Sequence, residues 1–191
     1  LRESAVPGAS YDAVIVAADP GTPQSLFDAT ALALQQGLAP SSVLVHGGSL
    51  ILPTDGRLGD EHEAAQAFYE ALTNADAPEQ VIQQLSGRTL RPGEDRAYLL
   101  AHLMQRYRVI AIGAEREHLV RASHLIPART ITEALEIAEL FTDGSRCALV
   151  VPQAAVTLPV FSPFASMWFD GESSLRPNVR EAPLSLPALS S

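Results

Sequence analysis

Short apolar runs and amphipathic segments alternate along the chain. The runs at residues 11–18, 109–112 and 147–151 are continuous and rich in β-branched residues, which is typical of strands covered on both faces. Gly47 and Gly48 divide a further apolar stretch at residues 43–52. We interpret this stretch either as one strand bent at the two glycines or as two short strands, and we expect the glycines to let the backbone approach another segment closely.

Between these strands, apolar residues recur at the spacing of an α-helix. Helices are predicted over residues 24–36, 60–72, 78–85, 93–107 and 130–140. Asp60 with Glu63, and Thr130 with Glu133, have the spacing of a capping box at a helix start. Gly37 follows the first helix, where we expect it to adopt the left-handed conformation that ends many helices.

The alternation of strands and helices predicts an α/β fold of three layers, with a mostly parallel, Rossmann-like sheet and helices on both faces. Residues 11–159 form the predicted domain. Residues 1–10 are expected to be an irregular lead-in or linker, and residues 160–191 an extended tail rich in proline and serine. Trp168 and Phe169 in this tail could dock on the domain or on a partner, and we favour the domain because docking there would hide apolar surface.

Composition and charge exclude several classes of function. The 191 residues carry a formal charge of −9 and only 13 scattered cations, so we expect no binding to nucleic acid. No apolar stretch approaches the roughly 20 residues that cross a bilayer, so we expect no membrane partner and a cytoplasmic location. All 13 cations are arginine, which excludes a Schiff base, pyridoxal phosphate attachment and a Walker-type lysine. The single cysteine, Cys147, lies in a predicted buried strand, where a thiol is usually a small hydrophobe.

Ligands of open parallel sheets collect at the carboxyl ends of the strands, so we expect a site in the loops after residues 18, 45 and 112. The segment between the first strand and the first helix supplies four candidate residues, Asp19, Gly21, Thr22 and Gln24. A helix start that follows a glycine can bind an anion, because its free amides point outward. The alternative is a plain turn with a helix cap, since neither a Gly-x-Gly-x-x-Gly nor a Walker pattern is present.

Two more polar residues lie in candidate loops. His46, which Gly47-Gly48-Ser49 follows, resembles the start of an esterase oxyanion loop, but the chain has no Gly-x-Ser-x-Gly motif, so we favour a tight backbone bend. Asp55 is either a turn former or a functional carboxylate near the cleft. The five histidines lack metal-binding spacing, so no metal site within this chain is predicted. We expect His62 to be solvated and His102 to be half-buried on its helix.

Several segments, taken in order, resemble the C-terminal half of the nickel-dependent lactate racemase family. They are Tyr-Asp-Ala-Val-Ile-Val at 11–16, Ser-Leu-Phe-Asp-Ala at 25–29, the glycine pair at 47–48 before an apolar run, and Asp-Gly at 55–56. Residues 130–138 are similar to the late helix of the family, and residues 150–159 to its closing strand and proline. The resemblance covers about residues 11–159, and the order of the segments carries most of it.

The resemblance implies a role within a two-domain enzyme. It implies an N-terminal half that binds a nickel pincer nucleotide and supplies two histidine bases, and a C-terminal domain that closes the cleft over a 2-hydroxy acid. We therefore expect no catalytic residue and no bound cofactor within this chain alone. The implied partners are the N-terminal cofactor-binding domain of the same protein and a small hydroxy-acid substrate.

The chain departs from the family at the helix that would face this cleft. The family commonly has Tyr-Gln-x-x-Lys there, and the matching positions are Phe27, Asp28 and Ala31. A lysine offsets the charge of a substrate carboxylate, whereas an aspartate would repel it, more strongly in a cleft of low dielectric. The preceding loop also departs, because it has Gly21 where the family has an asparagine and paired glycines. If a substrate binds, we expect that it is not simple lactate.

Three hypotheses follow from the sequence. Because residue 1 is leucine, we expect the chain to be a fragment, and the first hypothesis is the substrate-cleft domain of a racemase or epimerase, an isomerase only when joined to its N-terminal half. The second is a binding or assembly module that kept the fold of the family and lost its chemistry. The third is an unrelated flavodoxin-like or nucleotide-binding domain.

Overall fold

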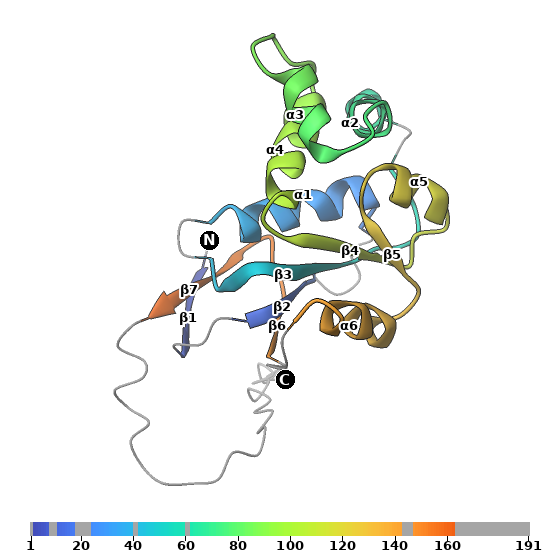
Figure 1. Ribbon diagram of the computed structural model, residues 1–191. Helices are drawn as coiled ribbons and strands as arrows, with labels where there is room; N and C mark the ends of the chain where they lie inside the picture. The colour runs from blue at the N-terminus through green and yellow to red at the C-terminus, as the bar shows by residue number, and fades with distance from the viewer. Residues whose placement is uncertain are drawn as a thin grey trace, which may run out of the picture.

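The computed structural model describes residues 2–7, 11–17, 24–39, 42–59, 62–142 and 147–162 (Figure 1). Its main sheet has five strands in the order β5-β4-β3-β2-β6, and every neighbouring pair is parallel. The strands are β2 (Tyr11–Val16), β3 (Leu44–Pro53), β4 (Arg108–Ile112), β5 (Ile126–Ala128) and β6 (Ala148–Val151). The predicted parallel α/β fold is confirmed.

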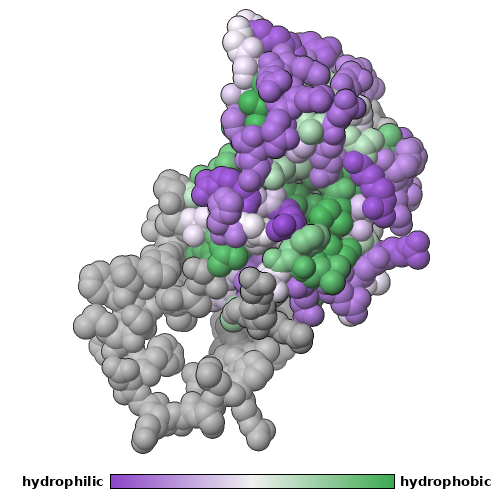
Figure 2. Space-filling view, in the orientation of Figure 1, coloured by the Kyte–Doolittle hydropathy of each residue, from purple (hydrophilic) through white to green (hydrophobic). Residues whose placement is uncertain are grey.

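Helices cover both faces of this sheet, because successive residues of a strand point to opposite sides. On one side the apolar core contains residues of α1 (Leu26–Gly37), α2 (Glu63–Thr73), α3 (Pro78–Leu85), α4 (Glu94–Met104) and α5 (Glu117–Ala122). Of these helices, α1 and α5 contact the strands, and α4 packs on α1 and carries α2 and α3 (Figure 1). Val14 and Leu50 belong to that apolar core, whereas Ile15 and Ile51 belong to a smaller core under α6 (Ile131–Glu139) on the other face. Figure 2 shows polar residues over the α2–α4 end of the molecule and hydrophobic residues gathered near α6.

The glycine pair lies inside a single strand. β3 runs through Gly47 and Gly48, with a register shift in its pairing with β2 between Tyr11 and Ala13. A Cβ atom at Gly48 would lie 2.8 Å from the backbone oxygen of Asp12. The first alternative, one bent strand with a close backbone approach, is confirmed. The predicted loop after residue 45 does not exist, because β3 continues to Pro53.

Gly37 ends the first helix for a different reason from the predicted one. It is the last residue of α1, and the C-cap is Leu38 with φ −95°. A Cβ atom at Gly37 would overlap the side chain of Leu103 on α4 and would lie 3.0 Å from a methyl group of Leu50. Close packing of α1 against α4 and the sheet, and not a left-handed backbone, therefore requires the glycine.

Thr130 caps the start of α6. The Thr130 hydroxyl accepts a hydrogen bond from the amide of Glu133 at 3.1 Å, and the Glu133 carboxylate accepts one from the amide of Arg129 at 2.7 Å. The predicted helix start with Thr130 as its cap is confirmed, although the Glu133 carboxylate bonds the amide of the residue before the N-cap and not that of Thr130. The capping box predicted for α2 is not observed at its N-cap. The helix begins at Glu63, its N-cap His62 makes no side-chain cap hydrogen bond, and Asp60 lies outside the described residues.

Replacing Thr130 with alanine should lower the free energy of unfolding by about 1 kcal/mol, because the amide of Glu133 loses its acceptor. Thr132 is exposed in the same helical turn and serves as the control, since its side chain caps nothing in α6. Denaturant unfolding of both alanine variants measures the difference. Equal losses would show that the cap does not stabilise α6.

Three regions differ from the sequence predictions. β1 (Arg2–Pro7) pairs in parallel with β7 (Thr157–Ser162) in a separate two-stranded sheet, so residues 2–7 of the predicted lead-in form a strand, and β7 crosses the predicted tail boundary at 159. Cys147 is exposed, because β6 is an edge strand of the main sheet and is not buried between two strands. The short elements α5 and β5 had no predicted counterpart. These features depend on contacts between segments that are distant in the sequence, and the local pattern of apolar and polar residues does not indicate such contacts.

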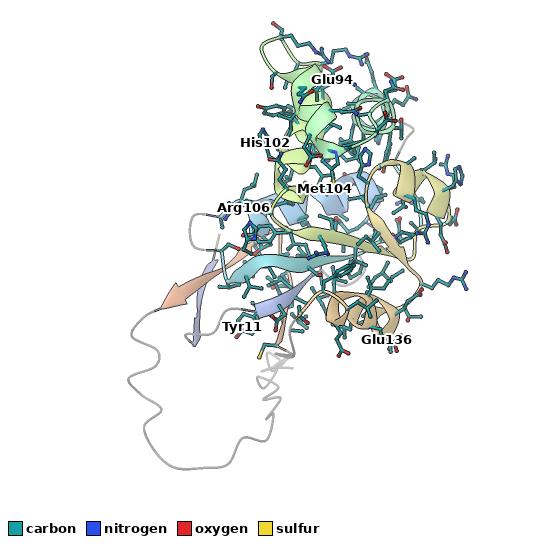
Figure 3. The ribbon with its side chains drawn as sticks, in the orientation of Figure 1. Tyr11, Glu94, His102, Met104, Arg106 and Glu136 are labelled. Carbon is teal, nitrogen blue, oxygen red and sulfur yellow. The ribbon has the colours of Figure 1, made fainter. Side chains whose placement is uncertain are left out.

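Two histidine predictions agree with the structure. His102 is half-buried on α4, where its ring meets that of Tyr98 edge to face with centroids 4.7 Å apart (Figure 3). His62 is exposed at the start of α2.

Candidate functional site

The carboxyl ends of the five parallel strands lie at one edge of the main sheet, where ligands of this fold class usually bind. After β3, residues 54–59 turn back onto the start of α1. The amide of Asp55 donates to the carbonyl oxygen of Gln24 at 2.9 Å, which joins two of the predicted site residues. We call the surface formed by residues 24–31, residues 54–59 and Arg96 the carboxyl-edge site.

The first four backbone amides of α1 already have acceptors. They are Leu26 N with Arg57 O (2.8 Å), Phe27 N with Leu58 O (3.1 Å), Asp28 N with Ser25 Oγ (3.1 Å) and Ala29 N with Ser25 O (2.9 Å). Amides that are bonded in this way do not receive an anion. The predicted anion site at this helix start is therefore wrong for these four amides, whereas Asp19, Gly21 and Thr22 lie outside the described residues.

Phe27, Asp28 and Ala31, the three positions that the resemblance matched to a polar segment, have different surroundings. Phe27 is buried, and its ring meets that of Phe68 edge to face with centroids 5.3 Å apart. Asp28 is exposed, and its carboxylate accepts a hydrogen bond from the Ser25 hydroxyl at 2.7 Å. Ala31 is half-buried one turn further along α1. Of the three, only Asp28 combines a charged side chain with exposure at the carboxyl-edge site.

Arg96 of α4 brings a cation to this site, which no pattern in the sequence had indicated. One of its guanidinium nitrogens donates to the carbonyl oxygen of Phe27 at 2.8 Å, and the group lies 3.8 Å from the centre of the Phe27 ring. Burial lowers the pKa of Arg96, while the negative charges of Asp28 and Asp95 act in the opposite direction. An arginine keeps its charge under such a shift, so a partly buried cation lies beside the exposed carboxylate of Asp28.

The carboxylate of Asp55 is hydrogen-bonded within its own loop. Its carboxylate accepts hydrogen bonds from the Arg57 side chain at 2.7 and 2.9 Å and from the Arg57 amide at 3.0 Å. The hydrogen bonds from Arg57 hold the pKa of Asp55 below its usual value, so the carboxylate is ionised and paired at neutral pH. Of the two alternatives for this residue, the geometry favours the turn former.

His46 does not join the other predicted site residues. It is exposed in the third position of β3, whereas the carboxyl-edge site lies beyond the last residue of that strand. The following Gly47 donates its amide to the carbonyl oxygen of Arg106 at 2.8 Å and accepts a hydrogen bond from the Arg108 side chain. The backbone at Gly47 therefore joins β3 to the start of β4, as expected of a bend and not of an oxyanion loop.

Within the described ranges, no three histidine, cysteine, aspartate or glutamate side chains are grouped so that they could hold a metal ion. In the same part of the chain, no helix has both the length and the apolar character needed to cross a bilayer.

The chain is similar to a known protein family and to a solved structure. The lactate racemase C-terminal domain family matches residues 14–158. The lactate racemase apoprotein from Thermoanaerobacterium thermosaccharolyticum has a similar structure, with a TM-score of 0.65 and 21% sequence identity. The match covers 79% of this chain and 36% of that chain, so this chain corresponds to about a third of the racemase. No curated protein matches the sequence.

Proposed function

Because the chain belongs to the family of lactate racemase C-terminal domains, we propose that it is the substrate-cleft domain of a 2-hydroxy acid racemase or epimerase that needs an N-terminal half for activity. The family match over residues 14–158 carries this proposal, since it includes the whole carboxyl-edge site. Membership in the family also removes the third hypothesis, an unrelated flavodoxin-like or nucleotide-binding domain. A cytoplasmic location stays a prediction.

The nickel pincer nucleotide belongs to the proposed longer protein. The described residues of this chain do not provide a cluster of metal ligands, and the four bonded amides of α1 do not fit a nucleotide phosphate. We therefore propose that the N-terminal half binds the nucleotide. The role proposed for this chain is to hold the substrate, with Arg96 as the nearest cation and Asp28 as the exposed anion.

The test joins the chain to the N-terminal half of its own protein and measures isomerisation of a panel of 2-hydroxy acids together with bound nickel. We expect turnover and nickel from the joined protein, and neither from the 191-residue chain. A joined protein that folds, binds nickel and turns over no hydroxy acid would contradict the proposal. That result would favour the second candidate, a binding module, which the closed helix start and the alanine at position 31 support.

Replacing Asp28 with asparagine should lower the KM of the joined enzyme for an anionic hydroxy acid by roughly fivefold. One negative charge close to a substrate carboxylate in a partly hydrated cleft costs about 1 kcal/mol. Glu136→Gln is the matched control, because it removes the same charge from an exposed position on α6, across the sheet. Steady-state kinetics of both variants make the comparison. An unchanged KM for the Asp28 variant would place the substrate away from α1.

A further inference from the structure

One face of the edge strand β6 is not covered by α6. Ala148 and Val150 pair in register with Ala13 and Ile15 of β2, which pack in the core under α6, so all four point to the α6 side of the sheet. α6 packs against β2, β3, β4 and β5, and Val150 is 56% exposed. Strands of parallel sheets are normally covered on both faces. An apolar surface therefore extends beyond the helix that should cover it.

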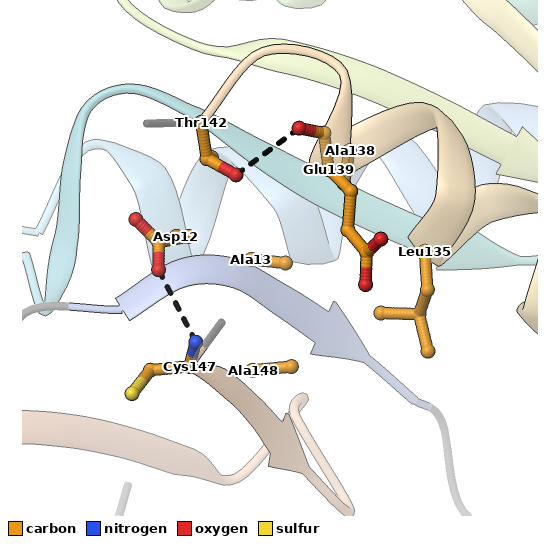
Figure 4. Close-up of a pocket in the computed structure, with 8 residues that line it drawn as sticks. All are labelled: Asp12, Ala13, Leu135, Ala138, Glu139, Thr142, Cys147 and Ala148. Carbon is orange, nitrogen blue, oxygen red and sulfur yellow. Dashed lines mark hydrogen bonds between the residues drawn. The ribbon is translucent and has the colours of Figure 1, made fainter. Parts of the chain in front are cut away.

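A cavity of about 160 Å³ lies where this surface meets α6 (Figure 4). Ala13, Leu135, Ala138 and Ala148 line it with apolar groups, and the backbone and carboxylate of Asp12 lie at one end, where the carboxylate accepts a hydrogen bond from the amide of Cys147. A cavity of ~150 Å³ with apolar walls can hold a benzene ring. We call the cavity together with Ala148 and Val150 the β6 apolar face.

The end of β7 places the following residues within reach of this face. Ser162 pairs with Pro7, which precedes Asp12 by five residues, so the gap from Ser162 to Asp12 is at most about 23 Å. Trp168 lies six residues after Ser162, in the segment Pro-Phe-Ala-Ser-Met-Trp-Phe at 163–169, so its Cα can reach about 22 Å from that of Ser162, and its long side chain extends this reach. A covalently attached segment also has a high effective concentration at a surface it can reach, which favours it over a second molecule.

The chemistry of the cavity favours an indole among these side chains. Tryptophan combines a large apolar ring system with one N–H donor, so it suits a site that is apolar inside and polar at one end. The carboxylates of Asp12 and Glu139 lie in the lining, and a carboxylate can accept several hydrogen bonds, so an indole N–H can donate to one of them, whereas a phenyl ring has no N–H or O–H to donate. Trp168 is the single tryptophan of the chain.

We propose that residues 164–169 bind across the β6 apolar face, with the indole of Trp168 in the cavity beside Cys147. The segment completes the apolar layer that α6 begins. This inference does not depend on the racemase proposal, because it concerns the face of the sheet opposite α1.

Single tryptophan and single cysteine residues give two independent measurements on the 191-residue chain. Trp168 fluorescence should be blue-shifted from that of tryptophan in water, should be independent of protein concentration, and should move to the red in Val150→Asp. Leu99→Asp is the matched control, since Leu99 is also an exposed apolar residue (43%) but lies on α4, on the opposite face of the sheet. It should leave the emission unchanged.

The second measurement does not require a change in the sheet. Trp168→Ala should increase the rate at which Cys147 reacts with an aromatic disulfide reagent several-fold, because the indole would no longer cover the thiol. Emission like that of free tryptophan, a blue shift that Val150→Asp leaves intact in a folded protein, or an unchanged thiol rate would each overturn the proposal. A blue shift that grows with protein concentration would instead assign the face to a second copy of the chain. Circular dichroism shows whether each variant folds. If Val150→Asp does not fold, the rate of reaction of Cys147 in Trp168→Ala tests the proposal alone.

Discussion

Replacing Gly93 with alanine should lower the free energy of unfolding by about 3–5 kcal/mol, the largest effect we expect from any single methyl group in this chain. Gly93 precedes α4 with φ +94°, a conformation that side chains rarely adopt. A Cβ atom there would also overlap the backbone oxygen of Ala64 on α2. Backbone atoms cannot rotate away as a side chain can, so α2 and α4 would have to separate.

Gly87 offers a matched control for this experiment. Its φ is +76°, but no atom lies within 4 Å of the position that a Cβ would take. Gly87→Ala therefore reports the backbone strain alone, and we expect a loss of about 1 kcal/mol. Denaturant unfolding of the two variants separates strain from overlap. Equal losses would mean that α2 and α4 are not held at this close contact in solution.

Replacing Glu94 with glutamine should lower the free energy of unfolding at neutral pH by about 2 kcal/mol, because it weakens charge-assisted hydrogen bonds to a buried group. The side chain of Glu94 is only 3% exposed, at the end of α4 away from the sheet (Figure 3). Its carboxylate accepts hydrogen bonds from Arg88 at 2.9 Å, from the Arg91 side chain at 3.0 Å and from the Arg91 amide at 2.8 Å. These bonds connect the segment between α3 and α4 to the start of α4.

The loss of unfolding free energy in Glu94→Gln should depend on pH. The hydrogen bond from Arg88, with those from Arg91, lowers the pKa of Glu94 from 4.5 to about 2 in the folded protein. A lowered pKa stabilises the fold fully above pH 4.5, and the contribution is lost as the pH falls towards 2. The difference between wild type and Glu94→Gln should therefore shrink over this range, whereas Glu136→Gln, at an exposed position, should show little difference at any pH. A difference that stays constant down to about pH 2 would contradict the assignment.

Predictions from the sequence succeeded where the pattern is local. Thr130 and Glu133 are three residues apart, and their hydrogen bonds depend on little else, so the start of α6 could be predicted. The apolar runs that became β2, β3 and β4 report burial on both faces directly. Cys147 lies in a similar run, yet its strand is at the edge of the sheet, and strand order is set by crossover connections that the run does not contain. β1 and β7 form for the same kind of reason, because each supplies hydrogen-bond partners for a segment about 155 residues away.

The candidate site could be predicted only in part. Its place at the carboxyl edge of the sheet follows from the alternation of parallel strands and helices, and the backbones of Gln24 and Asp55 are joined there by a hydrogen bond. The hydrogen bonding at the start of α1 could not be predicted. The acceptors for two of its amides are the carbonyl oxygens of Arg57 and Leu58, and every residue has such a backbone oxygen, so residue identity does not indicate it. Arg96 could not be predicted, because the spacing of apolar residues locates α4 along the chain but does not show which side of α4 faces α1.

The pairing of β1 with β7 also determines how the domain responds to mechanical force. The two strands are parallel and in register from Arg2 with Thr157 to Pro7 with Ser162. Tension applied between the first residue of β1 and the last residue of β7 pulls the strands past each other along their length, so the six residue pairs carry the load together and do not open one after another. The segment between the two strands, with the whole five-stranded sheet, bears no tension until that ladder slides. The ribbon thus acts as a mechanical clamp that isolates the carboxyl-edge site from forces transmitted along the polypeptide.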